Sequence, residues 1–235
     1  MQFTYFRDDK PLYLKPLILT VLLPGLIFCL WVIGRVTHAF QFYRASTSSG
    51  EPALKPGELF FISNWKTPKR FDIIAYRMVI AVQGANTLVH RICGVPGDVV
   101  EIKGGTLFVN GKDVDACLRL KHIYKVSRRY AGSFGFKEED AYTIPPYTDT
   151  LYIPLEDRTV REEQLPCTRY ILPAGLRDEE ILKSYQKSWN QDNFGPLRVP
   201  PDRFFVLGDN RGKSLDSRYI GLIDQQKVVG TVLWK

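Results

Sequence analysis

The chain has 235 residues, of which 45% are hydrophobic and 24% are charged, so it can bury a core and is not compositionally disordered. The formal net charge of +7 would suit an anionic partner, but the basic residues are scattered and accompany no nucleic-acid-binding motif, so we expect no nucleic-acid partner. The four cysteines form no CxxC pair and no His or Cys cluster has metal-ligand spacing, so we expect no metal and no cofactor.

An uncharged stretch of eighteen residues, Leu17 to Gly34, lies near the N-terminus. A helix needs about 17 to 25 residues to cross a bilayer, and a membrane helix tolerates a central Pro24-Gly25 better than a soluble one. A cleaved signal peptide fits less well, because the run is long and Arg-Val-Thr-His follows it. A buried core helix is the other alternative, although hydrophobicity on all sides favours lipid. We therefore predict a transmembrane helix over residues 15–35 and a lipid bilayer as partner.

Charge on the two sides of this span predicts its orientation. Three basic residues precede it and two follow it closely: Arg7, Lys10, Lys15, Arg35 and Arg44. The small excess before the span places residues 1–14 in the cytoplasm and residues 36–235 on the extracytoplasmic face of the plasma membrane.

From residue 45 onward, short β-forming runs alternate with turns. Five runs resemble strands: 58–63, 71–76, 86–93, 204–207 and 227–234. The segment 99–114 carries two hairpin signals, Gly104-Gly105 and Asn110-Gly111. The best helical candidate is short, over residues 177–187. The body is therefore predicted to be mostly β, built on an antiparallel sheet.

Residues 115–200 differ from this body because they are rich in Tyr, Pro and charge and have weaker strand signals. We interpret them as a subdomain inserted into the β body. Cys117 and Cys167 could form a disulfide in an oxidising compartment, and two free buried thiols are the equal alternative.

Three blocks carry candidate chemistry. The first, STSSGEPALKPG (46–57), would by itself be a polar linker. The second, LVHRICGVPGDVVEI, contains His90, and strand alternation separates His90 from Cys93. An isolated histidine in such a run is usually a core residue. The third, LGDNRGKSLDSRYIG (207–221), gathers charged and hydroxyl side chains between glycines, as a loop that supports a site would.

The order and content of these blocks resemble type I signal peptidases, membrane-anchored serine proteases of the S26 family. The family pattern Gly-Asp-Asn-Arg-x-x-Ser-x-Asp-Ser-Arg-x-x-Gly is fully matched from Gly208 to Gly221, and RICGVPGD matches the family's Lys-Arg block from its arginine onward. The resemblance spans roughly residues 15 to 235. It implies a signal peptidase-like antiparallel β peptidase domain with an inserted cap subdomain and one N-terminal membrane helix.

The chain departs from the family pattern at three places. In the serine block Ser49, Pro52 and Leu54 align, but Met and Thr are replaced by Gly50 and Ala53; in the Gly-Asp block the glycine is replaced by Phe71. At the third position, where the family has its catalytic lysine, this chain has His90.

Histidine can serve as the base at this position. A free lysine, with a pKa of about 10.4, must be strongly desolvated before it is neutral, whereas a free histidine, with a pKa of about 6.5, is already largely neutral at pH 7. Signal peptidases of the endoplasmic reticulum and of archaea are similar proteins with a Ser–His pair, in a run resembling Val89-His90-Arg91-Ile92.

The resemblance assigns roles by position. Ser49 would be the nucleophile that forms an acyl-enzyme, and His90 would be the general base. The Ser49 backbone N–H and the Thr47 hydroxyl would form the oxyanion site.

The third block would support this pair. Ser214 would hydrogen-bond to His90 and orient it, and Asp216 would pair with Arg218 and could also reach His90. Asp209 and Arg211 belong to the same supporting loop.

Two functions remain open at this point. The chain would cleave signal peptides from exported preproteins, or it would be a catalytically inactive homologue that binds signal peptides or a secretion partner at the membrane. The altered residues around Ser49 and His90 motivate the second alternative, and the complete 208–221 loop argues against it.

Overall fold

The fold is that of a computed structural model, which describes residues 14–37, 39–80, 84–131 and 149–234. The chain divides into two units, residues 1–41 and 42–235, and each is considered by itself. The predicted cytoplasmic segment lies almost wholly outside the described residues.

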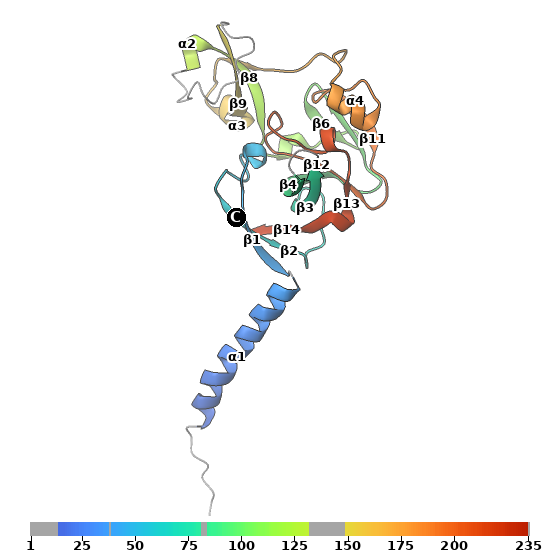
Figure 1. Cartoon of the computed structure of the whole chain (residues 1–235). Coiled ribbons are helices and arrows are strands. Elements are labelled where there is room, and N and C mark those ends of the chain that lie inside the picture. Colours follow the sequence, from blue (N-terminus) through green and yellow to red (C-terminus); the bar gives the residue numbers. More distant parts are fainter. Residues whose placement is uncertain (1–13, 38, 81–83, 132–148, 235) are drawn as a thin grey trace, which may run out of the picture. The chain divides into compact units, whose positions relative to one another are not determined.

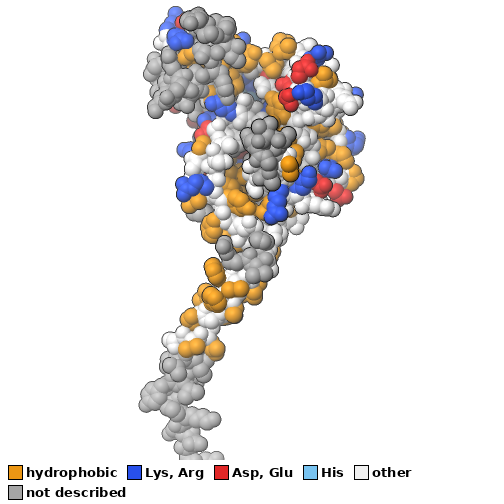
Figure 2. Space-filling view, in the orientation of Figure 1, with side chains coloured by type: hydrophobic (Ala, Val, Ile, Leu, Met, Phe, Trp, Pro, Cys, Tyr) orange, Lys and Arg blue, Asp and Glu red, His pale blue; other side chains and the backbone are white. Residues whose placement is uncertain are grey.

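The first unit contains the helix α1 (Leu14–Val36), and the second contains the β body. Hydrophobic side chains such as Leu19, Ile27 and Trp31 are exposed along α1, as the orange side chains in Figure 2 show. Within the residues that the structure describes, no helix is both long and apolar enough to cross a bilayer. The membrane span over residues 15–35 therefore stays a prediction.

The body consists mainly of strands, which confirms the mostly β prediction (Figure 1). The strands are β1 (Phe40–Arg44), β2 (Leu59–Ser63), β3 (Ile73–Ile80), β4 (Gly84–Gly94), β5 (Val99–Lys103), β6 (Thr106–Val109), β7 (Lys112–Asp113), β8 (Lys121–Ser127), β9 (Thr150–Glu156), β10 (Cys167–Arg169), β11 (Phe194–Arg198), β12 (Arg203–Leu207), β13 (Ile223–Asp224) and β14 (Val228–Trp234). The helices are short: η1 (Ser48–Gly50), η2 (Asp115–Cys117), α2 (Arg128–Ala131), α3 (Asp157–Glu162), α4 (Glu179–Tyr185), α5 (Ser217–Ile220) and η5 (Gln225–Lys227).

Three sheets are formed by the described strands. The main sheet has the order β1-β2-β14-β3-β4-β12-β13, and two smaller sheets have the orders β11-β5-β6-β7 and β10-β8-β9. The strand pairs with a described register are antiparallel, as the sequence predicts. The candidate base lies on β4 inside the main sheet, and the candidate nucleophile follows β1 at its edge.

The two hairpin signals of the 99–114 segment form the turns that the sequence predicts. Gly104 and Gly105 join β5 to β6 with positive φ angles of 54° and 75°, and Asn110 and Gly111 join β6 to β7 with φ of 52° and 78°. Glycine and asparagine adopt this left-handed region at little cost, so these residue types place the turns. The 177–187 helix is present as α4, which begins where Asp178 accepts hydrogen bonds from the Glu180 and Ile181 backbone N–H groups.

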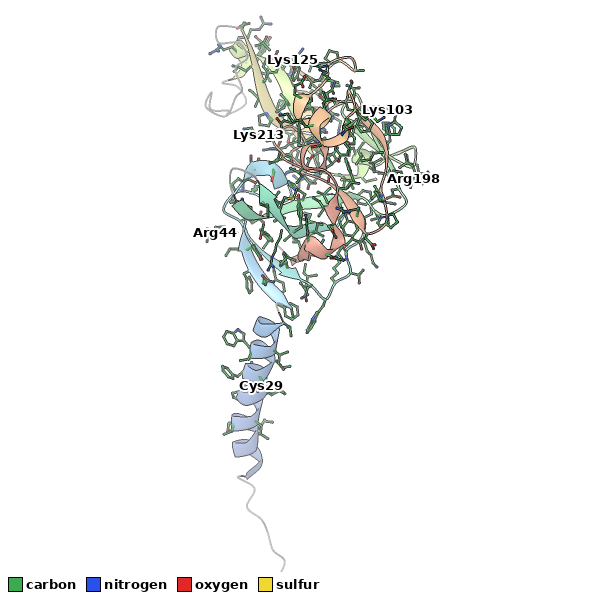
Figure 3. The ribbon with its side chains drawn as sticks, turned by 45° about the vertical axis from the view of Figure 1, so that its right-hand side comes forward. Cys29, Arg44, Lys103, Lys125, Arg198 and Lys213 are labelled. Atoms are coloured by element: carbon green, nitrogen blue, oxygen red, sulfur yellow. The ribbon has the colours of Figure 1, made fainter. Side chains whose placement is uncertain are left out.

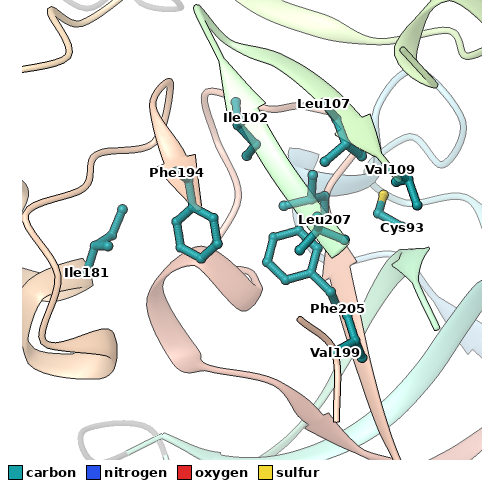
Figure 4. Packing of buried hydrophobic residues seen from close by; sticks show 10 residues of the cluster. Cys93, Ile102, Leu107, Val109, Ile181, Phe194, Val199, Phe205 and Leu207 are labelled. Carbon is teal, nitrogen blue, oxygen red and sulfur yellow. The ribbon is translucent and has the colours of Figure 1, made fainter. Parts of the chain in front are cut away.

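The largest hydrophobic cluster lies between β4, β12 and the β5–β6 hairpin (Figure 4). It contains Cys93, Val100, Ile102, Leu107, Val109, Ile181, Phe194, Val199, Phe205 and Leu207. A second cluster includes Ile74, Tyr76, Ile92 and Val206. Because Ile92 and Cys93 belong to different clusters, β4 is covered on both faces. This burial makes β4 a rigid support for His90.

The 115–200 segment divides between two sheets. Strands β8, β9 and β10 form the smallest sheet, with its own cluster around Val126 and Ile153, whereas β11 pairs with β5. Cys117 and Cys167 are both free thiols, and Cys117 is exposed.

The excess positive charge is spread over the body. Figure 3 labels Lys103, Lys125 and Arg198 at well-separated places on the ribbon, and the face drawn in Figure 2 shows Lys and Arg in scattered groups. This distribution agrees with the sequence, in which basic residues are dispersed.

Candidate active site

Ser49 lies in the one-turn helix η1, directly after the edge strand β1. Its carbonyl oxygen accepts a hydrogen bond from the Asn210 N–H at 3.0 Å, and the Ser48 carbonyl accepts one from Asn210 Nδ2 at 3.1 Å. On the other side, Leu54 is 2% exposed and its N–H donates to the Gly50 carbonyl. The first block is therefore fixed by the third block and by the core, rather than being a loose linker.

The hydroxyl of Ser49 lies 2.9 Å from the hydroxyl of Thr47. Thr47 is exposed and Ser49 is half-buried. The sequence analysis expected the Thr47 hydroxyl to form an oxyanion site with the Ser49 backbone N–H, and in the structure this hydroxyl lies beside the Ser49 hydroxyl.

His90 lies in the middle of β4 and is 3% exposed. Its Nε2 lies 3.2 Å from Ser214 Oγ, the contact expected from the third block. Its Nδ1 lies 2.7 Å from the hydroxyl of Tyr76, a residue that the sequence analysis did not select. Both ring nitrogens of His90 therefore have polar partners.

Tyr76 reaches His90 through the register of β3 and β4. Ile74 pairs with His90 and Tyr76 pairs with Leu88, so Tyr76 and His90 are diagonal neighbours on one face of the sheet. The sequence alone does not predict this contact, because it depends on the register in which β3 pairs with β4.

Ser49 and His90 face the same small cavity. It has a volume of about 80 Å³, and its other walls come from Tyr43 to Thr47 and from Thr87 to Val89. Strands β1 and β4 are separated in the sheet by β2, β14 and β3, so the sheet must curl to bring them to one cavity. Among the hydrogen bonds of the described residues, none joins Ser49 to His90 directly.

Among the described residues that line the cavity, Arg44 is the one cationic side chain and none is a lysine. Arg44 is exposed and points outward from the end of β1 in Figure 3. Lys55, near Ser49 in the sequence, and Lys103, after the His90 block, do not line the cavity, and Lys103 forms an ion pair with Glu101. His90 is therefore the candidate base among the described residues of this cavity.

Burial controls the electrostatics of His90. Desolvation lowers its pKa from 6.5 to about 4, and the carboxylates of Asp216 and Asp209 only partly oppose this effect. The guanidinium of Arg218 lowers the pKa further. His90 is thus neutral at pH 7 and is a weaker base than a free histidine.

The supporting loop contains a completely buried ion pair between Asp216 and Arg218. Arg218 Nε donates to Asp216 Oδ1 at 2.9 Å and Nη2 donates to Oδ2 at 2.8 Å. Asp216 Oδ2 also accepts the Gly208 N–H at 3.1 Å. Asp216 makes no hydrogen bond to His90 within the described residues and acts on it only through its charge.

Asp209 and Arg211 do not pair with each other but with residues outside the loop. Arg91, the residue after His90, donates to both carboxylate oxygens of Asp209, and Arg211 donates to both oxygens of Asp115. The sequence did not predict Arg91 and Asp115 as partners of the supporting loop. Arg91 is the arginine of the family's Lys-Arg block, and its place in that block could have pointed to such a role.

Position 208 requires a glycine, because the Ser214 side chain and the Ser49 backbone leave no room for a Cβ. A Cβ at this position would overlap Ser214 Oγ and come within 2.7 Å of the Ser49 carbonyl oxygen. The Ser214 side chain and the Ser49 backbone therefore both pack closely against Gly208.

The loop after Ser49 also contacts the smallest sheet. Lys121 at the start of β8 forms an ion pair with Glu51 at 2.7 Å, and its N–H donates to the Asp209 carbonyl. A larger cavity, about 660 Å³, lies elsewhere between the 64–70 loop, Phe204 and β14, and contains none of the candidate residues. We place the candidate chemistry in the smaller cavity because Thr47, Ser49 and His90 line it.

A serine and a buried neutral histidine that line one cavity beside a charged supporting loop make this a candidate serine hydrolase site. The family model described as signal peptidase, peptidase S26, matches residues 18–235. The chain therefore belongs to this family, whose enzymes are serine endopeptidases of the signal peptidase I type.

Individual relatives agree with this assignment. The chain is 29% identical over 206 residues to a signal peptidase I of Bacillus licheniformis, a match that covers 85% of this chain and 79% of the relative. It is 24% identical to signal peptidase I V of Bacillus subtilis, with coverage of 89% and 94%. A solved signal peptidase I of Enterococcus faecalis is 25% identical, with coverage of 72% of this chain and 98% of that chain and a TM-score of 0.33.

Proposed function

We propose that the chain is an active, membrane-anchored serine endopeptidase that removes signal peptides from exported preproteins through Ser49 and His90. The observation that carries this proposal is the shared cavity, which Ser49 lines together with a neutral His90. Membership of the family and the names of the relatives supply the substrate class.

The substrate would bind as an extended strand. The β1 edge and the Thr87–Val89 segment of β4 form two walls of the cavity, and an extended peptide between them could pair with either backbone. The cavity of about 80 Å³ favours small side chains just before the cleaved bond.

The reaction would proceed by acyl transfer. Ser49 Oγ attacks the carbonyl carbon of the scissile bond while its proton moves to His90 Nε2, the nitrogen that faces Ser214. The oxyanion accepts hydrogen bonds from the Ser49 N–H and the Thr47 hydroxyl. His90 then returns the proton to the leaving amine, and the C–N bond breaks. Water attacks the acyl-enzyme with His90 again as the base, which releases the signal peptide and restores Ser49.

The remaining proposed roles are structural. Ser214 orients His90, the Asp216–Arg218 pair shapes the supporting loop, and Asp209 and Arg211 anchor that loop to Arg91 and Asp115. The exposed apolar side chains of α1 support a single-pass anchor. The small excess of basic residues before the span supports an N-terminus in the cytoplasm and a peptidase domain on the extracytoplasmic face.

One observation favours a second candidate function, a catalytically inactive homologue that binds signal peptides. Ser49 and His90 share no direct hydrogen bond within the described residues, and both nitrogens of His90 already have other partners. Ser49 and His90 would then only shape the cavity that they line.

A cleavage assay separates the two candidates. The full-length protein is purified in detergent and incubated with a preprotein, alongside Ser49→Ala, His90→Ala and, as a matched control, Ser127→Ala on the smallest sheet. We expect cleavage by the unmutated protein and the control, and none by the two site variants. Binding of the signal peptide without cleavage by any protein would favour the inactive homologue.

A further inference from the structure

Tyr76 gives His90 a partner that a lysine at the same position could not use in the same way, because only a histidine has a second ring nitrogen. The Tyr76 hydroxyl lies 2.7 Å from Nδ1, and the two rings are 5.8 Å apart between centroids with an interplanar angle of 41°. The side chain of Tyr76 is completely buried. The direction of this single hydrogen bond therefore decides which nitrogen of neutral His90 carries its proton.

The hydrogen of the Tyr76 hydroxyl has one described acceptor, Nδ1 of His90. The nearby carboxylate of Asp216 already accepts from Arg218 on both oxygens and from the Gly208 N–H. A buried hydroxyl rarely leaves its hydrogen unpaired, and a phenol donates to an imidazole nitrogen more strongly than it accepts from an imidazole N–H. These conditions favour Tyr76 as the donor.

We infer that Tyr76 is a positioning residue that holds resting His90 in the tautomer with its proton on Nε2. In this state Nε2–H donates to Ser214 Oγ, and Nδ1 accepts from Tyr76. The inference rests on the proposed function, and it adds that Tyr76 reduces the rate of acyl transfer.

The Tyr76 hydrogen bond would slow catalysis, because it favours the tautomer of His90 that cannot accept the Ser49 proton. His90 can take the proton of Ser49 at Nε2 only when Nε2 is bare, which requires the other tautomer with the proton on Nδ1. In that tautomer Nδ1–H donates to the Tyr76 oxygen, and the Tyr76 hydrogen loses its partner. The reactive tautomer is thus a minor population, and the rate of acyl transfer is reduced by that fraction.

Tyr76→Phe removes the hydroxyl and keeps the ring. Neither tautomer then has a partner at Nδ1, so the preference for the resting form becomes smaller. We expect the population with the proton on Nδ1 to grow and kcat to rise by about fivefold, with little change in KM.

Two measurements on the full-length protein in detergent test the inference. The first is the nitrogen-15 NMR spectrum of histidine-labelled protein, which reports the protonated nitrogen of His90 among only three histidines. The second is the rate of preprotein cleavage. The matched control is Tyr124→Phe, which removes a phenol that donates to Asp157 beside His122, away from the cavity. We expect the control to leave the His90 signal and kcat unchanged.

The outcomes separate the inference from the proposed function. A resting His90 with its proton on Nδ1, an unchanged tautomer ratio in Tyr76→Phe, or a lower kcat in that variant would overturn the inference. The expected tautomer shift without cleavage by any of the three proteins would refute the proposed function and leave the assignment of Tyr76 intact.

Discussion

Arg91 holds Asp209 through two hydrogen bonds, from Nε to Oδ1 at 2.7 Å and from Nη2 to Oδ2 at 2.5 Å. Arg91 is the neighbour of His90 on β4, and Asp209 follows Gly208 in the supporting loop. The carboxylate of Asp209 is nearly buried and Arg91 also donates to the Phe71 carbonyl. This bidentate pair therefore fixes the strand of the base against the loop that carries Ser214.

Replacing Arg91 by Ala should lower the free energy of unfolding by about 3–5 kcal/mol, because it leaves a buried carboxylate without its partner. Arg91→Lys should cost less but not nothing, because lysine cannot form the two-pronged contact. Denaturant unfolding of the full-length protein, followed by tryptophan fluorescence, measures both changes. Arg119→Ala is the matched control: it breaks a pair between the exposed Arg119 and Glu156, and it should lower the free energy of unfolding much less than Arg91→Ala does. Equal effects of the Arg91 and Arg119 variants would contradict this role.

Ser214→Ala should reduce kcat by about ten- to a hundredfold while KM stays nearly constant, because it removes the oxygen that contacts His90 Nε2 and leaves the cavity walls in place. Steady-state cleavage kinetics measure the two constants separately. A rise in KM with unchanged kcat would mean that Ser214 binds substrate rather than orienting the base. Ser127→Ala is the control, because it removes a hydroxyl in β8 that does not line the cavity.

Gly208→Ala should abolish cleavage although glycine-to-alanine changes are usually mild. The added methyl group would push Ser214 and the Ser49 backbone apart at the point where they converge. Gly175→Ala is a matched control, since a Cβ there meets nothing within 4 Å. Cleavage assays on both variants, with circular dichroism to verify folding, test this. Retention of activity in Gly208→Ala would show that the two segments can separate without loss of function.

The sequence predicted the elements that depend on local pattern and missed the partners that depend on register. Alternation and turn residues placed β4, the β5–β6–β7 hairpins and α4 correctly, because each is specified within a few neighbouring residues. Tyr76 was missed because its approach to His90 depends on how β3 pairs with β4.

The same limit explains the charges of the supporting loop. Asp216 and Arg218 are two residues apart, so their pairing could be predicted from the sequence. Arg211 pairs with Asp115, almost a hundred residues earlier, and only the folded chain brings them together. Family resemblance located the site residues as a set, and the fold determined which of them touch.

The last prediction is a pH profile, and burial changes it from the one that sequence alone suggests. A free histidine would give a rise in activity between about pH 6 and 7. In the structure, desolvation lowers the pKa of His90 to about 4, with Asp216 and Asp209 opposing and Arg218 reinforcing this shift. Burial also raises the pKa of Tyr76, which faces His90 from β3, so its phenol keeps its proton over the whole range.

The base must be unprotonated, so activity rises as pH increases through the His90 pKa. We therefore expect kcat to be nearly level between about pH 5 and pH 8 and to fall only towards pH 4. Initial cleavage rates across this range, with circular dichroism at each pH, test the expectation. A rise centred between about pH 6 and 7 would mean that His90 is hydrated when it works, and a rise above about pH 8 would indicate a lysine base brought into the cavity.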